Sequence, residues 1–152
     1  MKTNAIFIWL LVSSFYLAAQ SDGARKEHFN TKKNVAIEGF DPVSYFDNKP
    51  SEGKPQFSYN YKGIVYHFAS AANLNKFKSA PEKYEPAYGG WCAYAMGDAG
   101  EKVKIDPDTF KIIDGKLYLF YNFWGNNTLN SWNKHEGKLK SNADKNWHQI
   151  FH

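Results

Sequence analysis

Aromatic and apolar residues alternate with polar ones over residues 56–68, and the alternation predicts a β-hairpin. A two-residue turn at Lys62-Gly63 places every large apolar side chain of the segment on one face, whereas a three-residue loop would scatter them. In this register His67 lies on the opposite face, across from Ser58. The predicted facing pairs are Tyr61 with Ile64, Tyr59 with Tyr66, and Phe57 with Phe68.

A second alternating stretch, residues 110–121, predicts another hairpin around Asp114-Gly115. Asp-Gly is typical of a type I′ turn, in which both central residues take positive φ. The side chains expected on the core face of this hairpin are Phe110, Ile112, Leu117, Leu119 and Tyr121.

Helical signals separate and follow these hairpins. Ser70 is a good N-cap for a helix that runs to Ala80, where Pro81 stops it. A further short helix is expected after Gly89-Gly90. From Phe123 onward the tail reads as helical, with a break near Gly137 and a last helix around 143–150. Hairpins mixed with short helices predict a small single α+β domain, not a parallel α/β sheet.

The N-terminal residues differ from the rest. Residues 5–12 form an uncharged apolar run that is too short to span a bilayer, and small residues follow at Ala18 and Ala19. We interpret residues 1–20 as a cleaved signal peptide, with a membrane anchor or an apolar first helix as alternatives. Residues 21–33 lack apolar periodicity and are expected to be a disordered lead-in to a domain over 34–152. The protein is then exported to a periplasmic or extracellular location, with no membrane span after cleavage.

Composition limits the possible partners and crosslinks. The formal net charge is +4 and the lysines are scattered, which argues against nucleic-acid binding. Cys92 is the single cysteine, so no intrachain disulfide can form. The fold must therefore rest on packing, for which five Trp, ten Tyr and twelve Phe supply large apolar surfaces.

Cys92 and Met96 are the residues with the most distinctive chemistry. Their spacing of four places them on one face of a helix, and a thiolate with a thioether suits Cu(I), with His67 as a third ligand. Two other interpretations stay open. Cys92 and Met96 can be core residues, or Cys92 can be a nucleophile with His67 as its base.

Several motifs occur in an order that resembles the YHS domain family, over nearly all of residues 35–150. They are Glu38-Gly39-Phe40-Asp41-Pro42-Val43-Ser44-Tyr45-Phe46, Tyr66-His67-Phe68-Ala69-Ser70, Pro81-Glu82-Lys83-Tyr84, Tyr88-Gly89-Gly90-Trp91-Cys92-Ala93-Tyr94-Ala95, Asp114-Gly115-Lys116-Leu117-Tyr118-Leu119 and Ala143-Asp144-Lys145-Asn146-Trp147. The resemblance implies a YHS-like fold and a role in metal binding, with copper as the first candidate metal. In the family that link rests on two cysteines in the pattern F-C-S-x-x-C. This chain has Ala69 and Asn73 at those positions, so the main ligands are missing.

We therefore expect an exported YHS-like binding or accessory module rather than an enzyme, with copper handling through Cys92, Met96 and His67 as the first specific hypothesis. One alternative is an aromatic-lined module that binds an apolar small molecule or a partner protein. Another is a thiol enzyme that uses Cys92.

Overall fold

The computed structural model describes residues 22–151 of the 152-residue chain. Helices and strands are mixed, as the hairpin and helix patterns predicted. In chain order the elements are β1 (Thr31–Lys32), β2 (Val35–Ala36), η1 (Ile37–Gly39), η2 (Ser44–Asp47), β3 (Lys54–Tyr61), β4 (Ile64–Phe68), α2 (Ala71–Ser79), α3 (Pro81–Tyr84), η3 (Ala87–Gly90), α4 (Ala93–Asp98), β5 (Asp106–Ile113), β6 (Lys116–Phe120), β7 (Asn122–Phe123), β8 (Asn126–Asn127), α5 (Thr128–Lys134) and α6 (Glu136–Phe151).

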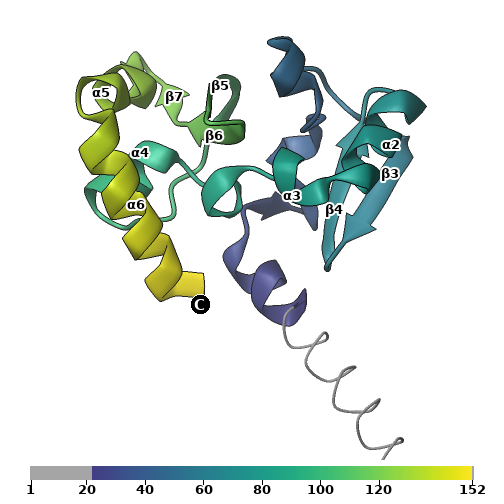
Figure 1. The fold of residues 1–152 in the computed structure, drawn as a ribbon, viewed down its shortest axis with the longest axis horizontal. Coiled ribbons are helices and arrows are strands. Elements are labelled where there is room, and N and C mark those ends of the chain that lie inside the picture. Colours follow the sequence, from purple (N-terminus) through teal and green to yellow (C-terminus); the bar gives the residue numbers. More distant parts are fainter. Residues whose placement is uncertain (1–21, 152) are drawn as a thin grey trace, which may run out of the picture.

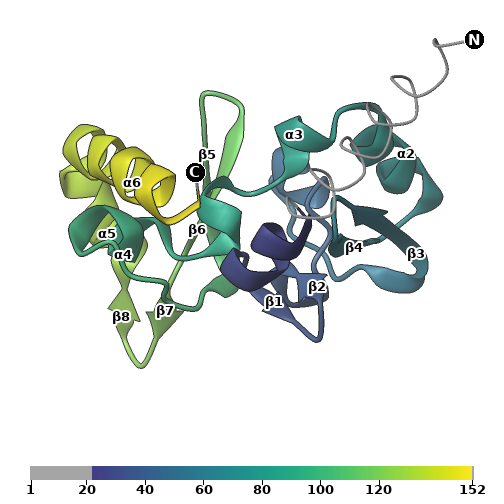
Figure 2. The ribbon, with the colours of Figure 1, turned by 90° about the horizontal axis from the view of Figure 1, so that it is seen from below.

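The chain forms two halves that lie side by side, with α3 and η3 between them (Figure 1). We call residues 22–86 the N-terminal half and residues 87–151 the C-terminal half. The N-terminal half contains a four-stranded sheet in the order β1-β2-β4-β3, in which β2 runs parallel to β4. The C-terminal half contains the two-stranded pairs β5-β6 and β7-β8 with α4, α5 and α6 (Figure 2).

The β3-β4 hairpin has the predicted turn and most of the predicted register. Tyr59 faces Tyr66 and His67 faces Ser58. The expected pairing of Phe57 with Phe68 is wrong, because the register shifts between residues 54 and 58 and Phe68 pairs with Lys54. The side chains of β4 that point inward are fully buried all the same.

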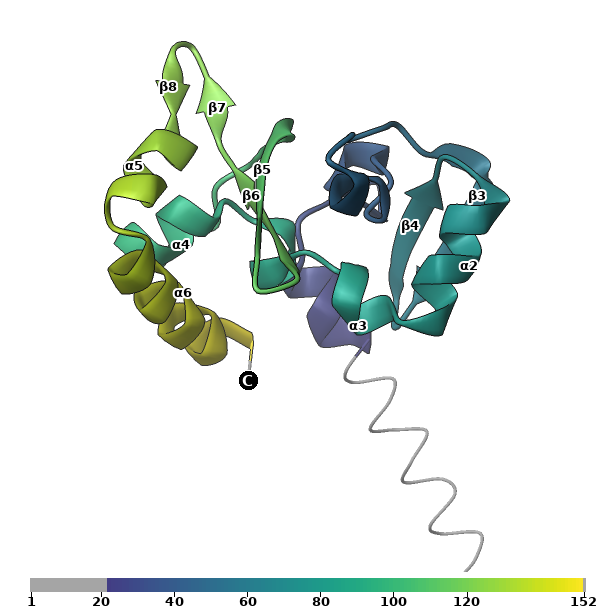
Figure 3. The ribbon, with the colours of Figure 1, turned by 45° about the horizontal axis from the view of Figure 1, so that its top comes forward.

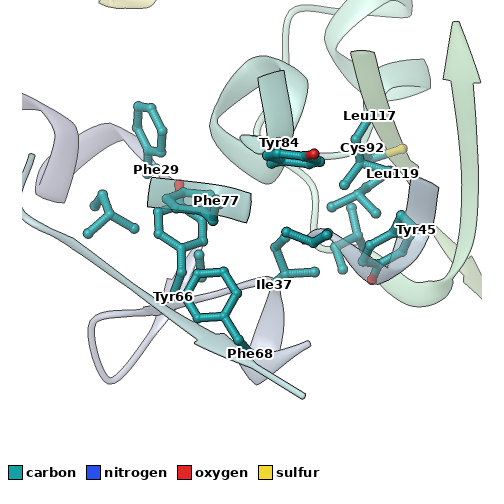
Figure 4. Close-up of a cluster of buried hydrophobic side chains, with 14 residues drawn as sticks. Phe29, Ile37, Tyr45, Tyr66, Phe68, Phe77, Tyr84, Cys92, Leu117 and Leu119 are labelled. Carbon is teal, nitrogen blue, oxygen red and sulfur yellow. The ribbon is translucent and has the colours of Figure 1, made fainter. Parts of the chain in front are cut away.

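Phe77 of α2 is the centre of the N-terminal core (Figure 4). Its ring lies 4.8 Å from that of Tyr66 and 5.1 Å from that of Phe68, measured between centroids. The helix is held in place at its start by Ser70, whose hydroxyl oxygen accepts a hydrogen bond from the Asn73 amide at 3.2 Å. The predicted N-cap is therefore confirmed, and it aims Phe77 at the sheet.

Strand β6 connects the cores of the two halves. Leu117 and Leu119 point into the cluster that contains Phe77, while Tyr118 and Phe120 pack in a second cluster around Trp132. A strand buried on both faces explains why its residues are almost all apolar. Its hairpin turn is the predicted one, with Asp114 at φ 50° and Gly115 at φ 73°.

Helices α4 and α6 pack closely in the C-terminal half. A Cβ at Gly97 would lie 2.4 Å from the carbonyl oxygen of Leu139, so only glycine allows this approach. Figure 3 shows the long α6 beside α4 and α5, with the β7-β8 hairpin projecting beyond them.

The prediction of a disordered lead-in over residues 21–33 is wrong for the described part. Residues 22–28 are helical, and β1 pairs with β2. Arg25 and Phe29 are buried, and the Arg25 guanidinium forms an ion pair with Glu85 and lies 4.2 Å from the centre of the Phe29 ring. The segment lacks apolar periodicity because a few specific contacts, and not an apolar stripe, attach it to the domain.

The expected helical tail from Phe123 onward needs two corrections. Residues 122–127 form the β7-β8 hairpin, whose turn residues Trp124 and Gly125 have φ of 52° and 78°. The predicted break near Gly137 is present at His135, but the last helix starts at Glu136 and not around residue 143. Gly137 is accommodated inside α6 because the rest of that helix packs on α4.

The signal peptide predicted over residues 1–20 lies outside the described residues. Within residues 22–151, none of the helices is both long and apolar enough to cross a membrane.

Candidate functional site

Cys92 is fully buried at the start of α4, beside Leu117 and Leu119 (Figure 4). Its sulfur lies 3.3 Å from the amide nitrogen of Tyr121 and 3.5 Å from the hydroxyl oxygen of Thr128. The Thr128 hydroxyl donates its one proton to the Tyr121 carbonyl at 2.9 Å. Thr128 must therefore accept from the thiol, while the Tyr121 amide donates to the sulfur. The sulfur therefore has both a hydrogen-bond acceptor and a hydrogen-bond donor within the protein.

Met96 follows one helical turn later, and its amide nitrogen donates to the carbonyl of Cys92 at 3.0 Å. The side chain is fully buried and packs in the second cluster, with Trp132. His67 belongs to the sheet of the N-terminal half. Its ring nitrogen Nδ1 lies 3.7 Å from the position that a Cβ on Gly39 would take. The structure thus brings Cys92 and Met96 onto successive turns, whereas the contacts of His67 come from the other half.

The two positions where the family pattern has cysteines belong to a different network, centred on Asp41. Asp41 is fully buried. Its Oδ2 accepts hydrogen bonds from the amide of Ala69 at 2.9 Å and from the side-chain Nδ2 of Asn73 at 2.6 Å. Its Oδ1 accepts from the amide of Val43 at 2.8 Å. The carboxylate thereby ties the loop before η2 to the junction of β4 and α2, with no sulfur involved.

These residues do not fit a preformed copper site. The sulfur of Cys92 already contacts protein donors and acceptors, and Asn73 directs its amide nitrogen, which is not a metal ligand, at Asp41. Within residues 22–151, no group of three or more His, Cys, Asp and Glu side chains could hold a metal ion. The assignment of copper to Cys92, Met96 and His67 stays a prediction.

A cavity of about 280 Å³ lies where the two halves meet, and we call it the junction cleft. One wall is formed by Phe29 and by residues 85–89, which include most of η3, and the other is formed by β6 and α6. Four aromatic side chains face it together with one lysine and two carboxylates. The lining residues are Phe29, Glu85, Pro86, Ala87, Tyr88, Gly89, Lys116, Tyr118, Asp144 and Trp147.

Backbone geometry shapes the cleft at residues 88 and 89. Tyr88 and Gly89 both have left-handed φ, 54° and 60°, which turns the chain against α6. A Cβ on Gly89 would lie 2.8 Å from the Trp147 ring, so glycine is required for this close approach. Trp147 in turn packs edge-on against Phe29 at 5.9 Å between centroids.

Lys116 is the cation of the cleft, and burial lowers the pKa of its ammonium group. Its Nζ donates one hydrogen bond to the carbonyl of Glu82 at 2.9 Å. An ammonium has three N–H donors, so further donors are available toward the cavity. A titratable group with a perturbed pKa in a cleft is typical of a functional site.

The carboxylates of the cleft are committed to protein partners. Glu85 accepts from Arg25 and, at 2.6 Å, from the hydroxyl of Tyr66. Asp144 accepts from the hydroxyl of Tyr88 at 2.8 Å, and burial together with this bond raises the pKa of Tyr88. These acids therefore fix the walls and leave Lys116 as the lining charge with free hydrogen-bonding capacity.

A larger groove of about 400 Å³ lies between α4, α5 and α6. Its charged lining residues, Asp98, Lys134, His135 and Lys138, are all exposed to solvent. Exposed side chains must lose rotamer freedom and hydration to hold a ligand, so this groove is less prepared for binding than the junction cleft.

Residues 22–151 form a small α+β domain with a cavity at the boundary of its two halves. Residues 43–88 match the YHS domain model, which covers the first part of the stretch over which the motifs resemble that family. The family is associated in general with metal handling. No curated protein and no solved structure matches the chain.

The sequence reasoning missed the residues of the junction cleft. In the sequence, Lys116 follows the Asp114-Gly115 turn, and Trp147 ends the motif that begins at Ala143. Neither carries a signal of its own, because a lysine after a turn and a tryptophan in a helix are both common. They share one cavity because β6 and α6 pack against residues 85–89.

Proposed function

We propose that this chain is an exported binding module rather than an enzyme, and that its ligand site is the junction cleft. The observation that carries the proposal is a cavity lined by Phe29, Tyr88, Tyr118 and Trp147 around the single hydrogen-bonding cation Lys116. A mostly apolar concave site with a few placed polar groups is the usual form of a small-molecule site.

The arrangement of reactive groups supports binding over catalysis. A nucleophile needs an adjacent base and access to substrate, whereas the Cys92 thiol is buried and hydrogen-bonded to Thr128. The tyrosine hydroxyls of the region, Tyr66 and Tyr88, have raised pKa values because burial disfavours their ionised forms. They act as hydrogen-bond donors to Glu85 and Asp144.

The proposal is tested by amide nuclear magnetic resonance of the mature chain, titrated with a set of small one-ring compounds. Shift changes are expected to concentrate on residues 85–89, 116–118 and 144–147. Trp147→Ala should weaken any binding about fivefold or more, since a stacking aromatic contributes about 1 kcal/mol or more. Trp124→Ala is the matched control, because Trp124 is 87% exposed and far from the cleft lining. Shift changes confined to other surfaces would overturn the proposal.

Copper handling is the second candidate, and the YHS domain match is the observation that favours it. It is tested by the metal content of protein purified without chelators. We expect less than stoichiometric copper and no change in thermal stability with EDTA, since packing alone holds the fold. One copper per chain that is lost in a folded Cys92→Ala variant would instead establish Cys92 as a ligand.

The exported location rests on the leader pattern in residues 1–20 and is tested separately. N-terminal sequencing of the mature protein should begin near residue 20, whereas an intact Met1 would contradict signal cleavage.

A further inference from the structure

From the junction cleft we infer the class of its ligand: a small planar aromatic carboxylate, bound with its acid group on Lys116 and its ring between Trp147 and the tyrosines. This inference rests on the proposed function and adds the chemistry of the ligand to it.

The charge balance around Lys116 favours an anion. The charged side chains next to it are Arg25, Glu82 and Glu85, and Lys62 lies 3.8 Å from Glu82. Three cations thus stand against two carboxylates. Glu85 is already shared between Arg25 and Tyr66, so it supplies little to Lys116. A ligand carboxylate would neutralise the extra positive charge and accept hydrogen bonds from the remaining N–H groups of the Lys116 ammonium.

The opposite side of the cleft carries no excess charge. Asp144 lies 3.3 Å from Lys140 and also accepts from Tyr88. This pairing leaves Lys116 as the group that can discriminate an acid from a neutral ligand. It also makes a cationic ligand unfavourable, because both lining carboxylates already have partners.

The shape of the walls favours a flat ring. Tyr88 and Tyr118 pack edge-to-face at 5.7 Å between centroids, and Trp147 stacks on Phe151 at 5.4 Å. These mutual contacts hold the rings in place before a ligand arrives, which reduces the entropy lost on binding. The Gly89 backbone adds a flat surface without a side chain, against the Trp147 edge.

The volume limits the size of the ligand. About 280 Å³ is at or below the lower end of the range for drug-sized ligands, roughly 300–1,000 Å³. A single ring or a fused pair with one acid group fits this space, whereas a nucleotide or a lipid chain would extend far outside it.

The test uses benzoate as the probe, with benzamide as its neutral isostere and cyclohexanecarboxylate as its non-planar counterpart, each titrated into the mature chain by calorimetry and amide shifts. Benzoate should bind at least about tenfold more tightly than benzamide, as expected for one charge-assisted hydrogen bond, and about fivefold more tightly than cyclohexanecarboxylate, as expected for one lost stacking face. Lys116→Met should bring benzoate down to about the affinity of benzamide. Lys116→Arg should retain the preference, and Lys54→Met is the control, since Lys54 is exposed on β3 away from the cleft.

The outcomes separate this inference from the proposed function. Equal affinity of benzoate and benzamide, with shifts at residues 85–89 and 116–118, would overturn the ligand class and leave the cleft as a site. Retained benzoate preference in a folded Lys116→Met variant would overturn the role of Lys116. If neither these probes nor other one-ring compounds shift the cleft residues, the proposed function itself is overturned.

Discussion

The two halves of the molecule use the same kind of packing but differ in what they do with their polar groups. In the N-terminal half, aromatic rings surround Phe77, and the buried carboxylate of Asp41 is satisfied by three donors from the same half. In the C-terminal half, rings surround Trp132, yet the polar residues of β6 and α6 line the cavity at the boundary.

Within the segment that matches the YHS domain model, residues 43–88, the buried polar groups are used to hold the fold together. The positions where the family pattern has cysteines are used for internal hydrogen bonding, through Ala69 and Asn73. The proposed ligand site lies instead at the end of the matched segment, at residues 85–89, and includes residues beyond it such as Lys116 and Trp147.

The largest expected effects come from removing the central ring of each core. Phe77→Ala and Trp132→Ala should each lower the free energy of unfolding by about 3–5 kcal/mol, because both side chains are fully buried. Urea unfolding followed by circular dichroism should show one transition for both variants, since β6 belongs to both clusters. Two separate transitions would show that the halves unfold independently.

Asp41→Asn should cost about 2–3 kcal/mol, because the new amide group presents donors to the donors of Ala69 and Asn73. The matched control is Asp47→Asn, an exposed residue at the end of η2, for which less than about 0.5 kcal/mol is expected. The two effects are measured as shifts in the urea midpoint of unfolding, with the denaturant slope (m value) unchanged. Equal effects of the two substitutions would mean that the Asp41 network contributes no specific stability.

The two hairpin turns of the C-terminal half can be compared with one substitution each. Gly115 and Gly125 both have positive φ, and a Cβ on either would meet nothing within 4 Å, so the cost is conformational alone. Gly115→Val should destabilise the fold by about 1 kcal/mol or more. Gly125→Val should cost less in global unfolding, because the projecting β7-β8 hairpin can open locally. A Gly115 variant as stable as the parent would contradict the turn.

The smallest effect expected is an increase in stability. Gly137 lies in the first turn of α6 with open space around its Cα and no positive φ. Gly137→Ala should raise the unfolding free energy by about 0.5–1 kcal/mol through higher helix propensity. Gly97→Ala is the contrasting variant, because a Cβ at Gly97 would collide with Leu139 and destabilise the α4-α6 contact. The melting temperatures of the two variants measure the difference. A loss of stability in Gly137→Ala would show that the start of α6 needs glycine.

Local patterns determined much of the N-terminal half and the central hairpin. The Lys62-Gly63 and Asp114-Gly115 turns, the Ser70 cap and the α+β class follow from contacts between residues close in sequence, and all are present in the structure. The YHS motifs identified the family for the same reason, since they lie in blocks that can be compared directly.

Only the tertiary structure decided the features that depend on distant contacts. Residues 22–33 pack on the domain because Arg25 reaches Glu85, sixty positions away. A pair this far apart in sequence leaves no periodic pattern from which it could be predicted. Cys92 looked like a ligand from its spacing to Met96, but its partners are Tyr121 and Thr128, about thirty residues further on. The junction cleft exists only where Gly89, Lys116 and Trp147 meet. Each of these residues is ordinary in its local segment, and packing of the two halves gives them a common surface.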